Sequence, residues 1–285
     1  MFIDIGKPIA DTTNAFIEWL IVNHGDVFES IANALLTVLI LIERVLRGAP
    51  PWSVILVAGL IAYAASRKPL LSVGVMVLAW LLGSLGLWEQ AMQTIAIMLV
   101  SVGIAIIIGI PLGVATARSD IARTLLNPIL DLMQTIPSFV YLIPAAMLFG
   151  LGKVPAILAT VIYATPPLIR LTDLGIRQVD HAVVEASRAF GATRWQMLRG
   201  VQIPLALPSI MQGINQTMMM ALSMVVIASM IGARGIGETV LLGLQRNDPG
   251  KGLVGGIGIV ILAIIFDRIS QAFGRRLQAY RAVEG

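Results

Sequence analysis

The sequence predicts an all-α polytopic membrane protein, on the basis of its composition and of long apolar runs. Of the 285 residues, 57% are hydrophobic and 13% are charged, whereas soluble domains carry about 25% charged residues. Long apolar segments recur along the chain, and about 20 such residues can cross a bilayer. There is no cysteine, which excludes disulfides and thiolate metal sites. The net charge of +4 fits arginine-rich cytoplasmic loops, so no nucleic-acid partner is expected.

The first 50 residues are expected to form an outer tail that contains one helix. Residues 1–28 are mixed and acidic, and no basic region precedes an apolar stretch there, so we expect no cleavable signal peptide. Residues 29–47 place apolar side chains at helical spacing, but their charge-free part is shorter than the roughly 20 residues needed to span. We expect this helix to lie in the membrane interface, with a spanning helix as the alternative.

About seven spanning helices are expected after this tail. The first two form an N-terminal hairpin within 51–88, at about 52–66 and 70–88. The other five belong to a core over 89–273, at about 91–116, 129–149, 154–172, 207–232 and 253–272. Pro137 and Pro144 interrupt one of these segments, which membrane helices tolerate where neighbours satisfy the freed backbone groups. Within the segment at about 91–116, the small residues Gly103, Gly109 and Gly113 could allow close helix packing.

The distribution of basic residues predicts the orientation. With the polar interval 173–206 inside the cell, 13 of the 20 lysine and arginine residues fall on the inner side. The positive-inside rule favours that arrangement. The N-terminus is therefore expected outside, and the tail 274–285 in the cytoplasm.

The longest polar stretch of the second half, 180–208, is predicted to be two short helices joined by a glycine elbow. Asp180 is a candidate N-cap, and Gly191 is a natural C-terminal stop. Thr193 and Gln196 have the spacing of a capping box that opens the second helix. Pro204 is expected to end that helix, because proline lacks the backbone N–H.

This stretch resembles the EAA motif of ABC importer permeases. Glu185-Ala186-Ser187 is followed after three residues by Gly191, and after nine more by Val201-Gln-Ile-Pro204. The stretches 131–144, 166–178 and 213–232 are similar to permeases of the glycine betaine/proline type, so that the resemblance covers about 88–272. It implies a MetI-like, type I ABC importer transmembrane domain in a bacterial inner (plasma) membrane.

The resemblance also implies that the loop docks as a coupling helix into a groove on a cytoplasmic ATPase. Val184 and Phe190, with Trp195, are then expected to fill the groove, and Gly191 permits the elbow because it has no Cβ. Glu185 and Arg188 would pair with the partner or cap the helix. The implied coupling residues are Glu185, Ala186, Arg188, Phe190, Gly191, Trp195 and Pro204.

No stretch has the spacing of a phosphate-binding loop, so ATP and Mg²⁺ are expected on the partner ATPase and no cofactor on this chain. The glycine-rich segment 232–238 is interpreted instead as a flexible outer turn. His24 and His181 lie in polar segments without metal-ligand spacing. We expect no metal site, no catalytic residue and no enzyme activity of the chain itself.

Polar side chains inside membrane helices are candidates for a translocation path. Gln216 and Ser223 are seven residues apart and therefore share one helix face. The alternative is that these groups make helix–helix hydrogen bonds. The candidate path residues are Asn215, Gln216, Thr217, Met219 and Ser223 of the sixth span, with Asp131 and Gln134 of the fourth.

The predicted function is that of a permease subunit for betaine-like quaternary amines; glycine betaine, proline betaine, choline and related solutes all fit. Quaternary ammonium groups favour aromatic faces, and only Phe139 and Tyr141 lie close together in the prospective core. High-affinity binding is therefore expected on a separate extracytoplasmic binding protein. Without an internal repeat, two copies are expected to pair within the lipid bilayer, each with one ATPase. The alternative is a stand-alone secondary transporter or channel.

Overall fold

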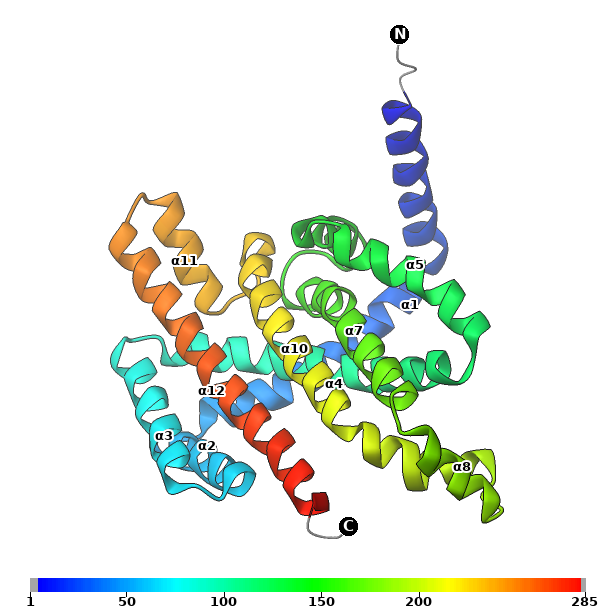
Figure 1. The fold of residues 1–285 in the computed structure, drawn as a ribbon. Helices are drawn as coiled ribbons and strands as arrows, with labels where there is room; N and C mark the ends of the chain where they lie inside the picture. Colours follow the sequence, from blue (N-terminus) through cyan, green and yellow to red (C-terminus); the bar gives the residue numbers. More distant parts are fainter. Residues whose placement is uncertain (1–4, 283–285) are drawn as a thin grey trace.

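The computed structural model describes residues 5–282, with side chains up to Arg276, and all regular elements in that range are helical (Figure 1). Five stretches in this range are long and apolar enough to cross a membrane: α1 (Gly6–Gly48), α4 (Trp88–Arg118), α7 (Lys153–Arg177), Arg194–Ile231 containing α10 (Ile203–Ile227), and α12 (Pro249–Ala282). The all-α prediction is confirmed. The span count of about seven stays a prediction.

The N-terminal helix is much longer than the sequence indicated. α1 is continuous over 43 residues, although only 29–47 was expected to be helical, and His24 marks a kink with φ −132°. No proline interrupts residues 9–48, so nothing in the acidic segment stops the helix. The part before the kink projects from the body (Figure 1), whereas Leu39 is fully buried in a cluster with residues of α4, α6 and α7.

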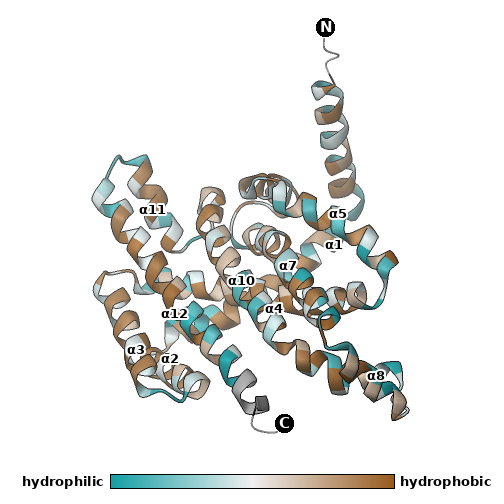
Figure 2. Ribbon diagram, in the orientation of Figure 1, coloured by the Kyte–Doolittle hydropathy of each residue, from teal (hydrophilic) through white to brown (hydrophobic). Residues whose placement is uncertain are grey.

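Two short apolar helices form the predicted hairpin. α2 (Pro51–Ser66) and α3 (Pro69–Ser84) are 16 residues each, so each is about 24 Å long. The Ser72 hydroxyl donates to the Gly59 carbonyl at 2.7 Å, which holds the two helices close together. Both helices are apolar along their length (Figure 2) and pack against α12.

The segment predicted as one span over 129–149 is broken in the structure. α5 (Asp120–Thr135) is followed by the 3₁₀ turn η1 (Ser138–Tyr141) and α6 (Leu142–Phe149), and the axis bends by 106° at the break. Pro137 explains the break, because the residue before a proline is driven out of the helical conformation; Ile136 has ψ 130°.

The centre of the bundle is formed by α4, α7 and α10, and small residues set how closely they approach. A Cβ on Gly113 would lie 2.5 Å from the Cβ of Thr172, and one on Gly109 would lie 3.0 Å from Leu168. The predicted packing role is confirmed for these two glycines. It is wrong for Gly103, where a Cβ would meet nothing within 4 Å.

The glycine-rich segment 232–238 is packed rather than loose, contrary to the prediction. The Ile236 N–H donates to the Thr94 hydroxyl of α4 at 2.9 Å, and Ile236 is fully buried. Gly235 is required here because a Cβ would lie 2.5 Å from that hydroxyl. The segment leads into α11 (Ile236–Gln245), which packs against α12.

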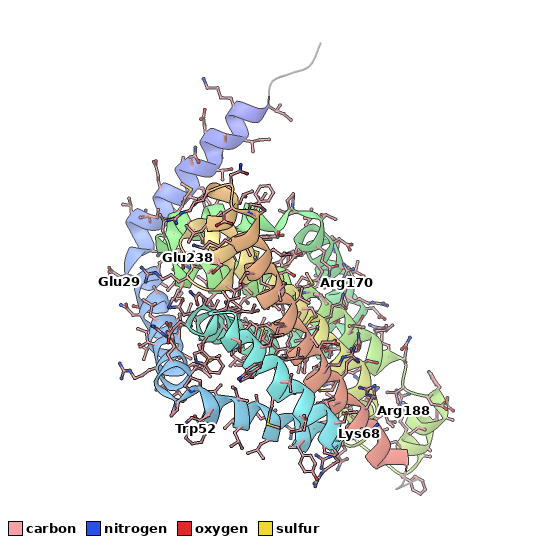
Figure 3. All side chains as sticks on the ribbon, turned by 90° about the vertical axis from the view of Figure 1, so that its left-hand side faces the viewer. Glu29, Trp52, Lys68, Arg170, Arg188 and Glu238 are labelled. Atoms are coloured by element: carbon pink, nitrogen blue, oxygen red, sulfur yellow. The ribbon has the colours of Figure 1, made fainter. Side chains whose placement is uncertain are left out.

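Four labelled charged residues mark the two ends of the helical bundle. Figure 3 places Lys68 and Arg188 toward one end, and Glu29 and Glu238 toward the other. The end with Lys68 and Arg188 also holds the last turns of α4 and α7. We refer to it as the coupling end and to the opposite end as the distal end.

Candidate functional site

At the coupling end, the first half of the polar stretch forms α8 (His181–Ala189), which is capped at both ends as predicted. The Asp180 carboxylate accepts the Ala182 N–H at 2.9 Å. Gly191 has φ +81°, and the Ala192 N–H donates to the Ser187 carbonyl at 3.1 Å. This pattern is a glycine C-terminal cap, which satisfies carbonyls that the helix leaves free. A helix of nine residues is marginal alone, so its order depends on these caps and on packing.

The second half begins as predicted but does not end as predicted. The Thr193 hydroxyl accepts the Gln196 N–H at 3.3 Å and the Gln196 side chain accepts the Thr193 N–H at 2.9 Å, a complete capping box for α9 (Arg194–Met197). A π-helical turn, η2 (Leu198–Gln202), then leads directly into α10, so Pro204 lies in the first turn of α10. The prediction that Pro204 ends the helix is wrong. The π turn widens the helix where proline cannot donate a hydrogen bond.

The loop presents a mixed apolar and charged surface. Phe190 is 93% exposed and Trp195 is 50% exposed, and the Arg199 guanidinium lies 4.3 Å from the centroid of the Trp195 ring. Glu185, Ala186 and Arg188 are also exposed. Exposed aromatic side chains such as these two, one at the end of α8 and one in α9, are typical of an interaction surface.

One predicted groove residue faces the other way. Val184 is only 8% exposed and is buried within this chain, so it is not available to a partner, while its neighbour Val183 is exposed. Sequence spacing did not separate these two valines, because the helix is short and its buried face is narrow.

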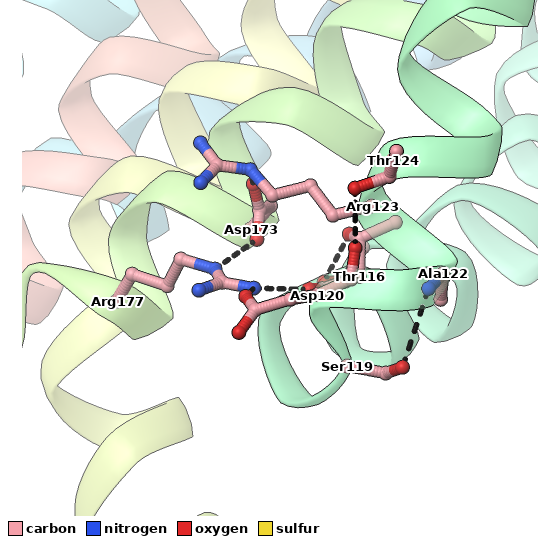
Figure 4. A network of polar contacts seen from close by, with 9 residues as sticks. Thr116, Ser119, Asp120, Ala122, Arg123, Thr124, Asp173 and Arg177 are labelled. Atoms are coloured by element: carbon pink, nitrogen blue, oxygen red, sulfur yellow. Dashed lines mark hydrogen bonds and ion pairs between the residues drawn. The ribbon is translucent and has the colours of Figure 1, made fainter.

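Immediately before α8, an ionic network ties three helices together (Figure 4). The Arg177 side chain lies 2.9 Å from Asp173 and 2.7 Å from Asp120, and it donates to the Thr116 carbonyl at 2.7 Å. Arg123 Nε lies 3.2 Å from Asp173, as an ion pair rather than an aligned hydrogen bond. Asp173 is 6% exposed, and its two arginine partners offset the cost of burying a carboxylate. The network joins the ends of α4, α5 and α7.

The structure divides the candidate path residues of α10 into two sets. Gln216 and Ser223 are exposed on one face, with Met219 partly buried between them, and the Ser223 hydroxyl donates to the Met219 carbonyl at 3.1 Å. Asn215 and Thr217 are buried, at 8% and 0% exposure. Only the first set is open to a path along the surface of α10.

The two candidates on α5 are both exposed. Asp131 forms an ion pair with Arg170 of α7, and Gln134 lies one turn further along. Asp131 therefore ties α5 to α7 at the side of the ionic network, and it lies apart from the open face of α10.

A further carboxylate, Asp267 of α12, was not predicted as a functional residue. The Asn215 amide donates to Asp267 at 3.1 Å, and the Gln271 amide donates to both of its oxygens at 2.7 and 2.9 Å. The sequence carried a signal for it, since Asp267 is the only acidic residue in the apolar run 253–272. Across the described part of the chain, no three histidine or acidic side chains lie close enough to hold a metal ion.

Comparison with known proteins gives consistent matches. Residues 105–279 match the family described as "Binding-protein-dependent transport system inner membrane component". The chain is 48% identical to the glycine betaine/proline betaine transport system permease protein ProW of Escherichia coli, over 94% of this chain and 75% of that protein. It is 43% identical to the glycine betaine/carnitine transport permease protein GbuB of Listeria monocytogenes, over 95% and 97% of the two chains. It is 42% identical to the glycine betaine transport system permease protein OpuAB of Bacillus subtilis, over 93% of each.

Solved structures are similar as well. An inward-facing structure of the MetNI methionine ABC transporter matches with a TM-score of 0.56 and 26% identity, covering 66% of this chain and 92% of that chain. A second crystal form matches with a TM-score of 0.59 and 24% identity, covering 67% and 95%.

Proposed function

We propose that this chain, which belongs to the family of inner membrane components of binding-protein-dependent transport systems, is the permease of an ATP-driven importer for betaine-like quaternary amines. Its fold is the predicted MetI-like transmembrane domain of ABC importers. Family membership makes the chain a non-catalytic transport component. The observation that carries the proposal is the capped loop of α8 and α9, which presents Phe190 and Trp195 outside the helical bundle.

The proposed partner at this loop is a cytoplasmic ATPase that binds ATP and Mg²⁺. Phe190 is 93% exposed, and its burial in a partner's groove would stabilise the complex by roughly 1.5–3 kcal/mol. Glu185, Arg188 and Arg194 around it are exposed and offer charges of both signs, as at the rim of a protein interface. Each permease would bind one ATPase through this loop.

A second copy of this chain is the proposed partner within the membrane. Gln216 and Ser223 lie on an exposed face of α10 that would otherwise meet lipid. Polar groups in membrane helices usually face other helices or a water-filled cavity. A homodimer with two ATPases would cover this face and enclose a path between the copies.

The proposed substrate class follows the names of the relatives, which are permeases for glycine betaine, proline betaine and carnitine. Phe139, one of the two clustered aromatics, is 53% exposed, and the other, Tyr141, donates its hydroxyl to the Met133 carbonyl at 2.9 Å. Neither ring stacks with another aromatic side chain among the described residues. A separate extracytoplasmic binding protein would supply the high-affinity site.

We also propose that the coupling end faces the cytoplasm and that the second half of α1 lies along the outer membrane surface. Three contacts support this placement, and each joins α1 to the distal end of another helix. The ring of Phe28 lies 5.4 Å from that of Phe149 at the end of α6. Glu43 pairs with Lys153 at 2.5 Å, at the start of α7. Arg47 pairs with Glu89 at 2.6 Å, at the start of α4.

The function is tested by reconstituting the chain in liposomes with its ATPase and binding protein. We expect uptake of radiolabelled glycine betaine that requires ATP, the ATPase and the binding protein together. Vesicles lacking the ATPase but carrying a sodium or proton gradient serve as the control. Uptake in those control vesicles at the same rate would instead establish a secondary transporter.

A further inference from the structure

Near the coupling end, α10 and α12 border a partly open cavity of about 340 Å³, which includes one of the candidate path residues, Asn215. Its polar lining comes from Gln212 and Asn215 of α10 and from Ser270, Gln271 and Arg275 of α12. A cavity of this size between membrane helices can hold a small organic molecule.

Asp267 determines how the amides beside this cavity are oriented. An ionised carboxylate only accepts hydrogen bonds, so Asn215 and Gln271 must both turn their N–H groups toward it. Their carbonyl oxygens therefore point away from Asp267. The two carbonyl oxygens remain free to accept hydrogen bonds from other neighbours.

Two of the lining side chains are buried, and each has one oxygen atom without a hydrogen-bond partner among the described residues. Asn215 is 8% exposed and Ser270 is 7% exposed, and neither Asn215 Oδ1 nor Ser270 Oγ has a partner in the described part of the chain. Buried polar atoms in proteins are nearly always paired, so two unpaired oxygen atoms beside one cavity indicate a partner that the described residues do not supply.

The cavity has one negative and one positive side chain beside it, Asp267 and Arg275, at different heights along α12. Asp267 takes part in none of the ion pairs formed by the described side chains. Arg275 lies eight residues further toward the coupling end and one turn, or about 6 Å, beyond Gln271. The cavity thus has an acceptor-rich wall backed by a carboxylate, and a guanidinium at its rim.

We infer that this cavity is a low-affinity binding site for a small zwitterion with a quaternary ammonium and a carboxylate, near the coupling end of the bundle. The inference rests on the proposed function. The oxygens of Asn215, Ser270 and Gln271 surround the ammonium, which has no N–H to donate and contacts acceptors through its polarised methyl groups. Arg275 donates to the carboxylate. Asp267 is a positioning residue that orients both amides and supplies the negative potential.

The test is equilibrium binding of glycine betaine to the permease–ATPase complex in nanodiscs, without the binding protein, by saturation-transfer NMR. Choline, which lacks the carboxylate, and 3,3-dimethylbutanoate, which lacks the positive charge, are measured in parallel. Arg275→Gln should weaken betaine about tenfold and choline less than twofold. Asp267→Asn should weaken betaine and choline about tenfold each and should not weaken the anionic 3,3-dimethylbutanoate, because the variant removes a negative charge.

Lys68→Gln is the matched control, because Lys68 is an exposed cation at the same end of the bundle, outside the cavity. It should leave all three ligands unchanged. Binding-protein-stimulated ATP hydrolysis shows which variants remain folded and assembled. If Asp267→Asn fails to assemble, Ser270→Ala replaces it as the test variant. Ser270→Ala removes only one lining hydroxyl and should weaken betaine binding measurably.

Three results would overturn the inference: no saturable betaine binding to the wild type, equal losses for betaine and choline in Arg275→Gln, or unchanged betaine binding in both Arg275→Gln and Asp267→Asn. These outcomes are separate from failure of the proposed function. If ATP-dependent uptake is present while the cavity variants bind betaine normally, the permease function stands and the site does not. If uptake is absent in the wild type, the proposed function itself fails.

Discussion

The glycine elbow of the coupling loop gives the sharpest test of how ATPase binding depends on local backbone geometry. Gly191 has φ +81°, and a Cβ added there would meet nothing within 4 Å. Gly191→Ala therefore introduces backbone strain alone, without a steric clash. Left-handed backbone costs a non-glycine residue about 1–2 kcal/mol. Because α8 is short and largely exposed, the strain is relieved most easily by unwinding its last turn.

An energy of 1–2 kcal/mol corresponds to about a five- to thirtyfold lower population of the docking conformation. We expect the affinity of the ATPase for the purified permease to fall by that factor in Gly191→Ala, measured by titration of fluorescent ATPase onto permease in nanodiscs. Gly191→Asn should be affected less, because asparagine adopts the left-handed conformation more readily than alanine.

Gly200→Ala is the matched control within the same loop. Its backbone φ is not positive, and a Cβ there would also meet nothing within 4 Å. Alanine is favoured over glycine in a helix, so this variant should bind the ATPase at least as well as the wild type. Equal losses in the two alanine variants, or full affinity in Gly191→Ala, would refute the reasoning from backbone strain.

Three further predictions concern the loop, the core and the ionic network. Phe190→Ala should leave the melting temperature unchanged, because the ring is exposed, and should lower ATPase affinity about tenfold or more in the same titration. Gly113→Ala should destabilise the chain by about 1–3 kcal/mol through overpacking, whereas Gly103→Ala should be neutral or stabilising, as judged by thermal unfolding in detergent. Asp173→Asn should lower the free energy of unfolding by about 1–3 kcal/mol, because two arginines lose their buried charged partner. Asp120→Asn should lower it by less than about 1 kcal/mol, because Asp120 is exposed. Equal melting temperatures for these two variants would contradict the reasoning.

Local signals in the sequence predicted the coupling loop well, because its structure is determined by nearby residues. The Asp180 cap, the Gly191 turn and the Thr193–Gln196 box each depend on contacts over five residues or fewer. Pro204 was misread for a non-local reason. The helix continues through it because a π turn precedes it and because α10 packs along its length against α7.

Tertiary packing accounts for most of the other differences. The turn at 232–238 has the composition of a flexible loop, but Thr94 of α4, some 140 residues away in the chain, fixes it by a hydrogen bond. Gly103 and Gly113 are alike in sequence, and only the position of α7 distinguishes the packed one. Asp267 was overlooked because its importance depends on Asn215, which belongs to another helix. A single sequence does not specify such pairings.

The packing of α7 against α10 leads to a prediction about how the coupling loop moves. α8 and α9 join these two helices, and a Cβ on Gly175 would lie 2.6 Å from Ser209, so the helices are in backbone-level contact where the loop leaves them. Packed interfaces of this kind shift as units and do not deform continuously. A displacement of the loop by the ATPase should therefore move α7 and α10 together and reach α5 through the Arg123–Asp173 ion pair.

Spin labels can test this directly, since the chain has no cysteine of its own. Leu174 of α7 and Leu205 of α10 are 42% and 46% exposed, so labels at cysteines placed there should be tolerated. In doubly labelled permease diluted with unlabelled copies, the distance between these two positions should be the same with and without ATP bound to the ATPase. A matched pair that joins Leu174 to exposed Leu70 of α3 should change, because α3 is attached through α2, α4 and α12 and not through the loop. A change of several ångströms between the labels on α7 and α10 would show that the loop separates these helices, and rigid transmission through them would then be excluded.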